Sequence, residues 1–255
     1  MRFDPTIALS IALAAIVCLC GPFVLGILWR QRTGVAPAAF GWGMVVFAAA
    51  LVLRLWQFPL GRWVHAAHPM WTTWFLMFSA CTAGVFEEVG RWIGYRTVLR
   101  GERTQRVAVM YGLGHGGCES ILLVSLPMVG LLIAWALAAR GQIDAGPATQ
   151  AIQQQLEGLG AWGVQLAVLE RASAMVLHLG LSLIVLQAFT RRDNRWLLAA
   201  IAIHTVFDAA AVLLNRHVSA VQTELVIAVA AGGALYAGLR MSGLTATRAA
   251  PAPAP

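Results

Sequence analysis

The sequence predicts an all-α polytopic membrane bundle of about seven transmembrane helices. Of its 255 residues, 59% are hydrophobic and 11% are charged, and the mean hydropathy is +0.73. So few charges cannot solvate an ordinary globular surface, which excludes a soluble enzyme and a disordered chain. The net charge of +7 comes from 18 arginines without a lysine, placed in short clusters between apolar runs. Such placement is typical of membrane topology, and we expect no nucleic-acid partner.

Seven runs are long enough to cross about 30 Å of hydrocarbon, which takes roughly 20 helical residues. They are 6–29, 38–57, 71–93, 107–139, 161–189, 196–214 and 221–239. The first has no evident cleavage site, so we expect it to remain as a span. The fourth would be about 50 Å long as one straight helix, so it must tilt, extend beyond the bilayer or break. Its candidate break points are Gly112, Gly114, Gly116, Gly117 and Pro127.

The distribution of arginine predicts the orientation of these spans. One set of loops and the tail hold eleven arginines: Arg30, Arg32, Arg96, Arg100, Arg103, Arg106, Arg191, Arg192, Arg195, Arg240 and Arg248. The opposite set holds four: Arg2, Arg62, Arg140 and Arg216. Because cytoplasmic loops carry the excess of positive charge, we expect the N-terminus outside and the C-terminus in the cytoplasm. We expect the chain to lie in a bacterial inner membrane.

A single membrane domain is expected over residues 1–244, followed by a tail at 245–255. The tail consists mostly of alanine and proline and is expected to be disordered. The polar segment 141–160 carries Ile152, Leu156 and Leu159 at helical spacing. It is expected to form an amphipathic helix on the outer surface or a plain surface loop.

Ionisable side chains occur inside the predicted spans, where they are costly. Eight of them are charged: Arg54, Glu87, Glu88, Arg91, Glu119, Glu170, Arg171 and Asp208. At about 2.5–3.5 kcal/mol each, eight unpaired charges at mid-membrane would cost about 20–28 kcal/mol. Mutual pairing, a bound cation or a water-filled cavity must compensate them. Three histidines accompany the charges: His115, His178 and His204.

The spacing of these residues predicts a shared site. Three pairs are four residues apart and therefore lie on one helical face: Glu87 with Arg91, His115 with Glu119, and His204 with Asp208. Counted from the arginine-rich loops at about 1.5 Å per residue, the histidines and Asp208 lie roughly 10–20 Å from the cytoplasmic boundary. The glutamate pair is somewhat shallower. Polar groups from four helices thus converge on the cytoplasmic half of the bilayer.

Three imidazoles and several carboxylates at one depth are suitable ligands for a divalent metal, with zinc expected. The hypothesis is that His115, His204 and one of Glu119, His178 or Asp208 bind it. Either Glu87 or Glu88 would act as the general base on water, and Arg91 would orient the glutamates. Glu170 and Arg171 would complete the polar core. Whether a metal or a glutamate alone activates the water is left open by the residues.

Four motifs in order resemble the YhfC-type intramembrane metalloproteases over about 71–214. They are FEEVGR at 86–91, GLGHGGCES at 112–120, Glu170-Arg171 followed by His178, and HTVFD at 204–208. These proteins resemble, more distantly, the type II CAAX prenyl endopeptidases and the Abi and PrsW membrane proteases. The resemblance implies that Glu87 and Glu88 are the paired glutamates that activate water. It also implies that His115 and His204 match the histidines of later motifs, and that Asp208 matches the residue four positions after the last histidine.

The expected function is hydrolysis of a peptide bond in a membrane-associated protein or peptide. Two other interpretations remain. A non-catalytic scaffold or immunity-type protein could keep the polar core for packing alone. A cation or proton pathway would need polar residues that continue to the outer face, whereas the outer halves of these spans are nearly all apolar. The oligomeric state is not predicted.

Overall fold

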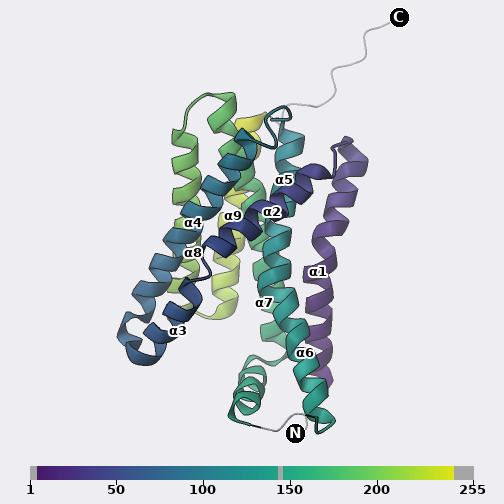
Figure 1. The fold of residues 1–255 in the computed structure, drawn as a ribbon, viewed down its shortest axis with the longest axis vertical. Helices are drawn as coiled ribbons and strands as arrows, with labels where there is room; N and C mark the ends of the chain where they lie inside the picture. Colours follow the sequence, from purple (N-terminus) through teal and green to yellow (C-terminus); the bar gives the residue numbers. More distant parts are fainter. Residues whose placement is uncertain (1–4, 143–145, 244–255) are drawn as a thin grey trace, which may run out of the picture.

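The computed structural model describes residues 5–142 and 146–243, and the described chain is all helical, as predicted (Figure 1). The long helices are α1 (Pro5–Thr33), α2 (Ala38–Leu53), α3 (Gln57–Ala67), α4 (Thr72–Arg96), α5 (Gln105–Ser120), α6 (Leu126–Ala139), α7 (Pro147–Thr190), α8 (Arg195–His217) and α9 (Ala220–Ser242). A 3-10 turn at Pro69–Trp71 precedes α4, and a π-helical turn at Ile121–Ser125 joins α5 to α6. The predicted tail at 245–255 lies outside the described residues.

Five helical segments of the described chain are long and apolar enough to cross a membrane, which indicates an integral membrane protein. A sixth is obtained if α2 and α3, which meet at 46°, count as one broken span. The remaining predicted span corresponds to α4, which is 25 residues long. Three buried charges on α4, those of Glu87, Glu88 and Arg91, lower its hydropathy. The helix that departs from the apolar pattern is therefore the one that brings most charge into the bundle.

The second predicted span, residues 38–57, does not form one continuous helix. α2 ends at Leu53, and α3 begins at Gln57 in a different direction. Arg54 lies at the bend, and its backbone N–H donates to the carbonyls of Leu51 and Val52. The bend places the Arg54 side chain against α4, where it pairs with Glu87. The need to pair a largely enclosed arginine provides a physical reason for a break at this position.

The fourth predicted span is continuous through its glycines, so a break at Gly112, Gly114, Gly116 or Gly117 is wrong. These glycines are helical, and the irregular turn comes later, at Ile121–Ser125, just before Pro127. Proline has no N–H to donate, so the helical ladder is interrupted near it.

The glycines of α5 instead allow neighbouring helices to come close. A Cβ on Gly114 would collide with the backbone of Phe40 in α2, and one on Gly112 would lie 2.9 Å from the carbonyl oxygen of His178 in α7. Small residues at such contacts let helix backbones approach inside a membrane. The close approach positions His115 between α2 and α7.

We expect Gly114→Ala to destabilise the protein by about 1–3 kcal/mol, the usual cost of overpacking a tight contact. The new methyl group would meet backbone atoms of Phe40, which cannot move aside as a flexible side chain would. Gly130→Ala in α6 is the matched control, because a Cβ there meets nothing within 4 Å. Thermal unfolding in detergent measures both. Equal melting temperatures for the two variants would contradict the packing described.

α7 is the central helix of the bundle. In its apolar window 78% of the residues are buried, against 33% or less in the other four apolar spans. It packs against α9, α5, α1 and α8. A break at Gly160, with a φ of 61°, separates its long inner part from the preceding helical segment. This left-handed conformation favours glycine. The segment predicted at 141–160 is thus helical from Pro147, while residues 143–145 and the side chains of Ile152, Leu156 and Leu159 are not described.

The arginine-rich connections gather at one end of the bundle. The turns from α1 to α2, from α4 to α5 and from α7 to α8 lie at the upper end of Figure 1, and the turns into α4 and α9 lie toward the lower end. Two hydrogen bonds join segments at the upper end. Trp29 Nε1 donates to the carbonyl of Arg106 at 2.9 Å, and Arg191 Nη2 donates to that of Met241 at 3.2 Å. The structure thus places the loops that we predict as cytoplasmic side by side.

Candidate metal centre

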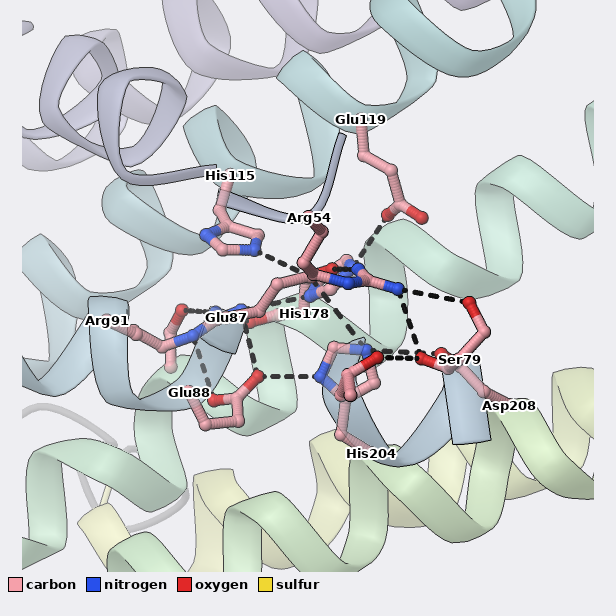
Figure 2. A network of polar contacts seen from close by, with 12 residues as sticks. Arg54, Ser79, Glu87, Glu88, Arg91, His115, Glu119, His178, His204 and Asp208 are labelled. Atoms are coloured by element: carbon pink, nitrogen blue, oxygen red, sulfur yellow. Dashed lines mark hydrogen bonds and ion pairs between the residues drawn. The ribbon is translucent and has the colours of Figure 1, made fainter. Parts of the chain in front are cut away.

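The ionisable residues of five helices meet in one buried network (Figure 2). Its members are Arg54 from the end of α2; Glu87, Glu88 and Arg91 from α4; His115 and Glu119 from α5; His178 from α7; and His204 and Asp208 from α8. α4 packs against α8 and α2, and α5 packs between α2 and α7. All eight residues predicted as catalytic groups or metal ligands are therefore brought together, from positions as far apart as 87 and 208.

Glu87 lies at the centre of this network. Its Oε1 accepts from Arg54 Nη1 at 3.1 Å. Its Oε2 lies 3.2 Å from His115 Nε2 and 3.9 Å from His204 Nε2. The residue is 5% exposed. One carboxylate oxygen is thus held by a permanent cation, while the other faces two imidazoles.

Glu88 faces in a different direction and has a different role. Its Oε2 pairs with Arg91 Nε at 3.0 Å, and its Oε1 accepts from His204 Nδ1 at 2.9 Å. Glu88 and Arg91 are completely buried. Neighbouring helical positions point about 100° apart, so the two adjacent glutamates meet different groups. Glu87 faces His115 and the Nε2 edge of His204, whereas Glu88 bridges Arg91 and His204 Nδ1.

Arg91 holds α4 to α7. It donates through Nη1 to the carbonyl of His178 at 2.9 Å and also to the hydroxyl of Ser182. Its Nη2 lies 3.0 Å from His178 Nδ1. A guanidinium can only donate, so Nδ1 of His178 accepts and the neutral ring carries its hydrogen on Nε2. Nε2 then donates to Glu119 Oε2 at 2.7 Å.

A chain of ion pairs extends from His178 along α5 and α7. Glu119 accepts from Arg171 Nη1 at 2.9 Å through its other oxygen, and Arg171 also pairs with Glu170. The side chain of Glu170 is 40% exposed, so this chain leads from the buried network to the surface of α7. Glu170 and Arg171 therefore belong to the predicted polar core but do not contact the central carboxylate of Glu87.

His204 has a different hydrogen-bonding pattern from His178. Its Nδ1 donates to the carboxylate of Glu88, which leaves the Nε2 lone pair unprotonated in the neutral ring. That Nε2 lies 3.6 Å from Asp208 Oδ2 and 3.9 Å from Glu87 Oε2. A lone pair directed toward two carboxylates is repelled unless a cation lies between them. Either a proton or a metal ion satisfies this arrangement.

Arg54 was not predicted to take part in the network. Besides Glu87, it contacts Ser79, whose carbonyl accepts from Arg54 Nη2 at 3.1 Å. Gln57 extends this contact, because its Oε1 accepts from the Ser79 hydroxyl at 3.2 Å. In the sequence, the signal for a role of Arg54 was that a single arginine interrupts an apolar run. Its partner could not be found from spacing, because Glu87 is on another helix, 33 positions away.

Nitrogen and oxygen atoms of the network are of the type that binds a metal, and three of them lie close to the spacing that a metal site needs. Glu87, His178 and His204 each offer one atom, and all three atoms lie within 4.8 Å of one another. Zinc ligands at about 2.0–2.1 Å from the ion would be about 3.4 Å apart in a tetrahedral site, so a modest contraction would close the group. The Nε2 lone pair of His204 is already available to a metal. His178 would first have to give up the hydrogen bond from its Nε2 to Glu119. The contact between His204 Nδ1 and Glu88 also matches the carboxylate–histidine pairs that orient metal-binding imidazoles.

The other predicted ligands surround this group. His115 contacts Glu87 through Nε2, and its buried Nδ1 has no hydrogen-bond partner among the described residues. Glu119 lies behind His178, and Asp208 lies beside His204 with its side chain 35% exposed. Chemically, the network offers one carboxylate facing imidazoles, a second carboxylate that orients a histidine, and two arginines that hold the carboxylates in place. Such a set can bind a cation and transfer a proton to or from water.

Comparison with known proteins supports this interpretation. The family described as YhfC intramembrane metalloprotease matches residues 16–231. The uncharacterized membrane protein YhfC of Bacillus subtilis (strain 168) is 28% identical over 243 residues, which cover 89% of this chain and 93% of that protein. No solved structure matches the chain. The family match spans most of the sequence and includes all four motifs, so the chain belongs to the YhfC intramembrane metalloprotease family.

Proposed function

We propose that this protein is a metal-dependent intramembrane endopeptidase that hydrolyses a peptide bond of a membrane-associated protein or peptide. The observation that carries the proposal is the environment of His204. Its Nδ1 is committed to Glu88, and its Nε2 faces the carboxylates of Glu87 and Asp208. A buried imidazole nitrogen between two acids is a site for a cation, and the family to which the chain belongs is a metalloprotease family.

His204 and His178 would hold the divalent metal, zinc, and Glu87, the third member of the group, would lie beside it as the general base. When bound, a metal of this kind polarises the peptide carbonyl and makes a water molecule more acidic. Glu87 would receive the proton of the attacking water through Oε2, which faces both imidazoles, and would pass it to the leaving amine. His115 orients Oε2 of Glu87, and Arg54 holds Oε1. Arg91 keeps Glu88 in place, and Glu88 orients His204.

The same proposal includes the orientation in the membrane. Counting α4 as a span, despite its charges, restores the seven spans that the sequence predicts. With the arginine-rich end in the cytoplasm, the N-terminus lies outside and the C-terminus inside. α4 would then bring Glu87 and Glu88 into the cytoplasmic half of a bacterial inner membrane. Water must reach this depth, and the partly exposed Asp208 is a point at which the network meets the surface.

Metal analysis of the purified protein tests the proposal directly. We expect one divalent metal per chain in the wild type, and loss of most of it in His204→Ala, since removing a ligand typically weakens metal affinity by at least about 10–100-fold. The matched control is His217→Ala, an exposed histidine at the end of the same helix, which should keep its metal. Mass spectrometry of the metal and thermal unfolding with a chelator are the two readouts. A metal-free wild type, or equal metal in both variants, would end the metal proposal.

A further inference from the structure

A cavity lies at the arginine-rich end of the bundle, outside the network around Glu87. It has a volume of about 780 Å³ and opens between the start of α5 and the ends of α7 and α9. Three arginines line it: Arg103, Arg106 and Arg191. Its lining includes no member of the buried network, so the peptidase proposal does not account for it.

Two of these guanidinium groups are held in place by neutral groups. Arg103 lies over the ring of Phe189 at 4.3 Å, and its Nε donates to the carbonyl of Tyr95 at 3.0 Å. Arg191 lies over the ring of Trp196 at 4.9 Å, and its Nη2 donates to the carbonyl of Met241. Stacking and carbonyl contacts orient a guanidinium without neutralising it.

No carboxylate neutralises the three arginines within residues 5–142 and 146–243. None of them takes part in an ion pair of the described chain. The first turn of α5 adds to the positive field, because its N-terminal residues Thr104 and Gln105 also line the cavity. A helix N-terminus carries a partial positive charge, and here the Thr104 hydroxyl caps the N–H of Val107. The cavity is thus a concentration of positive charge that no carboxylate of the described chain balances.

The remaining walls of the cavity indicate what kind of anion fits. Val35, Leu186 and Met241 supply apolar surface beside the guanidinium groups. Arginine pairs with phosphate through two parallel hydrogen bonds, and basic pockets between helices on the cytoplasmic side suit phospholipid headgroups. A molecule with a phosphate and an apolar part could therefore contact the arginines and the apolar residues of the cavity at the same time.

We propose that this cavity binds the phosphate group of an anionic phospholipid. The phosphate contacts Arg103, Arg106 and Arg191, and the glycerol and first acyl carbons lie against the apolar wall. Free phosphate has the same chemistry for the arginines but cannot use the apolar surface. Since the cavity shares no residue with the Glu87 network, this proposal stands or falls independently of the peptidase activity.

Native mass spectrometry of the full chain in detergent tests it, with phosphatidylglycerol, phosphatidylcholine and inorganic phosphate as separate probes. We expect one tightly retained phosphatidylglycerol in the wild type and weaker retention of phosphatidylcholine, which has no net charge. Arg106→Gln should weaken phosphatidylglycerol binding by about fivefold, the typical contribution of one arginine near anionic lipid. The Arg106 side chain makes no hydrogen bond or ion pair within residues 5–142 and 146–243, so the variant should fold normally. Arg103→Gln is the second variant.

The matched control is Arg96→Gln, because Arg96 also stacks on an aromatic ring, that of Trp92, but does not line the cavity. It should bind phosphatidylglycerol as the wild type does. If inorganic phosphate displaces the lipid and Arg106→Gln weakens that competition, the arginines bind phosphate from either source. Equal lipid binding in Arg106→Gln, Arg103→Gln and Arg96→Gln would overturn the proposal. So would equal retention of phosphatidylglycerol and phosphatidylcholine by the wild type.

Discussion

Glu87→Gln is expected to lower peptide hydrolysis by about 10²–10⁴-fold while leaving the amount of folded protein unchanged. The glutamine keeps the size of the side chain and can still contact Arg54 and His115, but it cannot receive a proton from water. The measurement compares membrane-embedded peptides in cells that express the wild type or the variant, so that substrates accumulate in the variant. Glu102→Gln, an exposed glutamate in the turn between α4 and α5, is the control and should behave as the wild type.

The Glu87→Gln variant also distinguishes the peptidase hypothesis from the hypothesis of a non-catalytic scaffold. A scaffold that keeps the polar core for packing predicts an unchanged peptide profile and a reduced yield of Glu87→Gln. The peptidase predicts the reverse. Metal content completes the comparison: a Glu87→Gln protein that keeps its metal and loses activity supports proton transfer by Glu87. A variant that loses its metal would show instead that Glu87 is a ligand.

Arg91→Met is expected to destabilise the protein by about 3–5 kcal/mol, the usual result of removing one partner of a buried ion pair. Methionine fills similar space, but Glu88 would remain as a completely buried carboxylate without its arginine, held only by His204 Nδ1. The contacts of Arg91 with the His178 carbonyl and with Ser182 would also be lost. The free energy of unfolding in detergent is the measurement. The control is Arg96→Met on the same helix, which should stay within about 0.5 kcal/mol because its side chain is exposed.

A double variant tests the reason for this effect. Arg91→Met with Glu88→Gln removes the unpaired charge together with its partner, so it should be more stable than Arg91→Met alone. If the two variants unfold equally easily, the loss comes from the contacts between α4 and α7 and not from the charge on Glu88.

Much of the architecture could be predicted because the membrane imposes it on the sequence. A helix that crosses hydrocarbon needs a long apolar run, so α1, α8 and α9 were found within a few residues of their ends. Irregular backbone was harder to predict. The irregular turn lies beside Pro127, which was one of the predicted break points, whereas the glycines of α5 that were also predicted as break points are contacts between helices. The bend after α2 depends on which groups lie opposite it.

The site was predicted as a set of residues but not as a network. Charges in apolar runs identify the members, since each one needs compensation. Spacing four apart puts His204 and Asp208 on one face, where they lie 3.6 Å apart, but it could not decide which glutamate pairs with Arg91, and the structure pairs Arg91 with Glu88. Two side chains on one helical face can contact each other. Whether they do depends on the rotamers that they adopt when the helix packs against its neighbours.

By itself, the sequence determined that this is a helical membrane protein, which residues are too polar for lipid, and that they lie at a similar depth along their helices. Those properties depend on composition and on distance along one chain. Only the tertiary structure decided that Glu87 lies beside His115 while Glu88 bridges Arg91 and His204, and that Arg54 joins them. It alone also showed that Arg103, Arg106 and Arg191 surround one cavity. The reason is that each pairing joins different segments, and their rotation and separation are set by close packing at small residues, which a linear pattern does not encode.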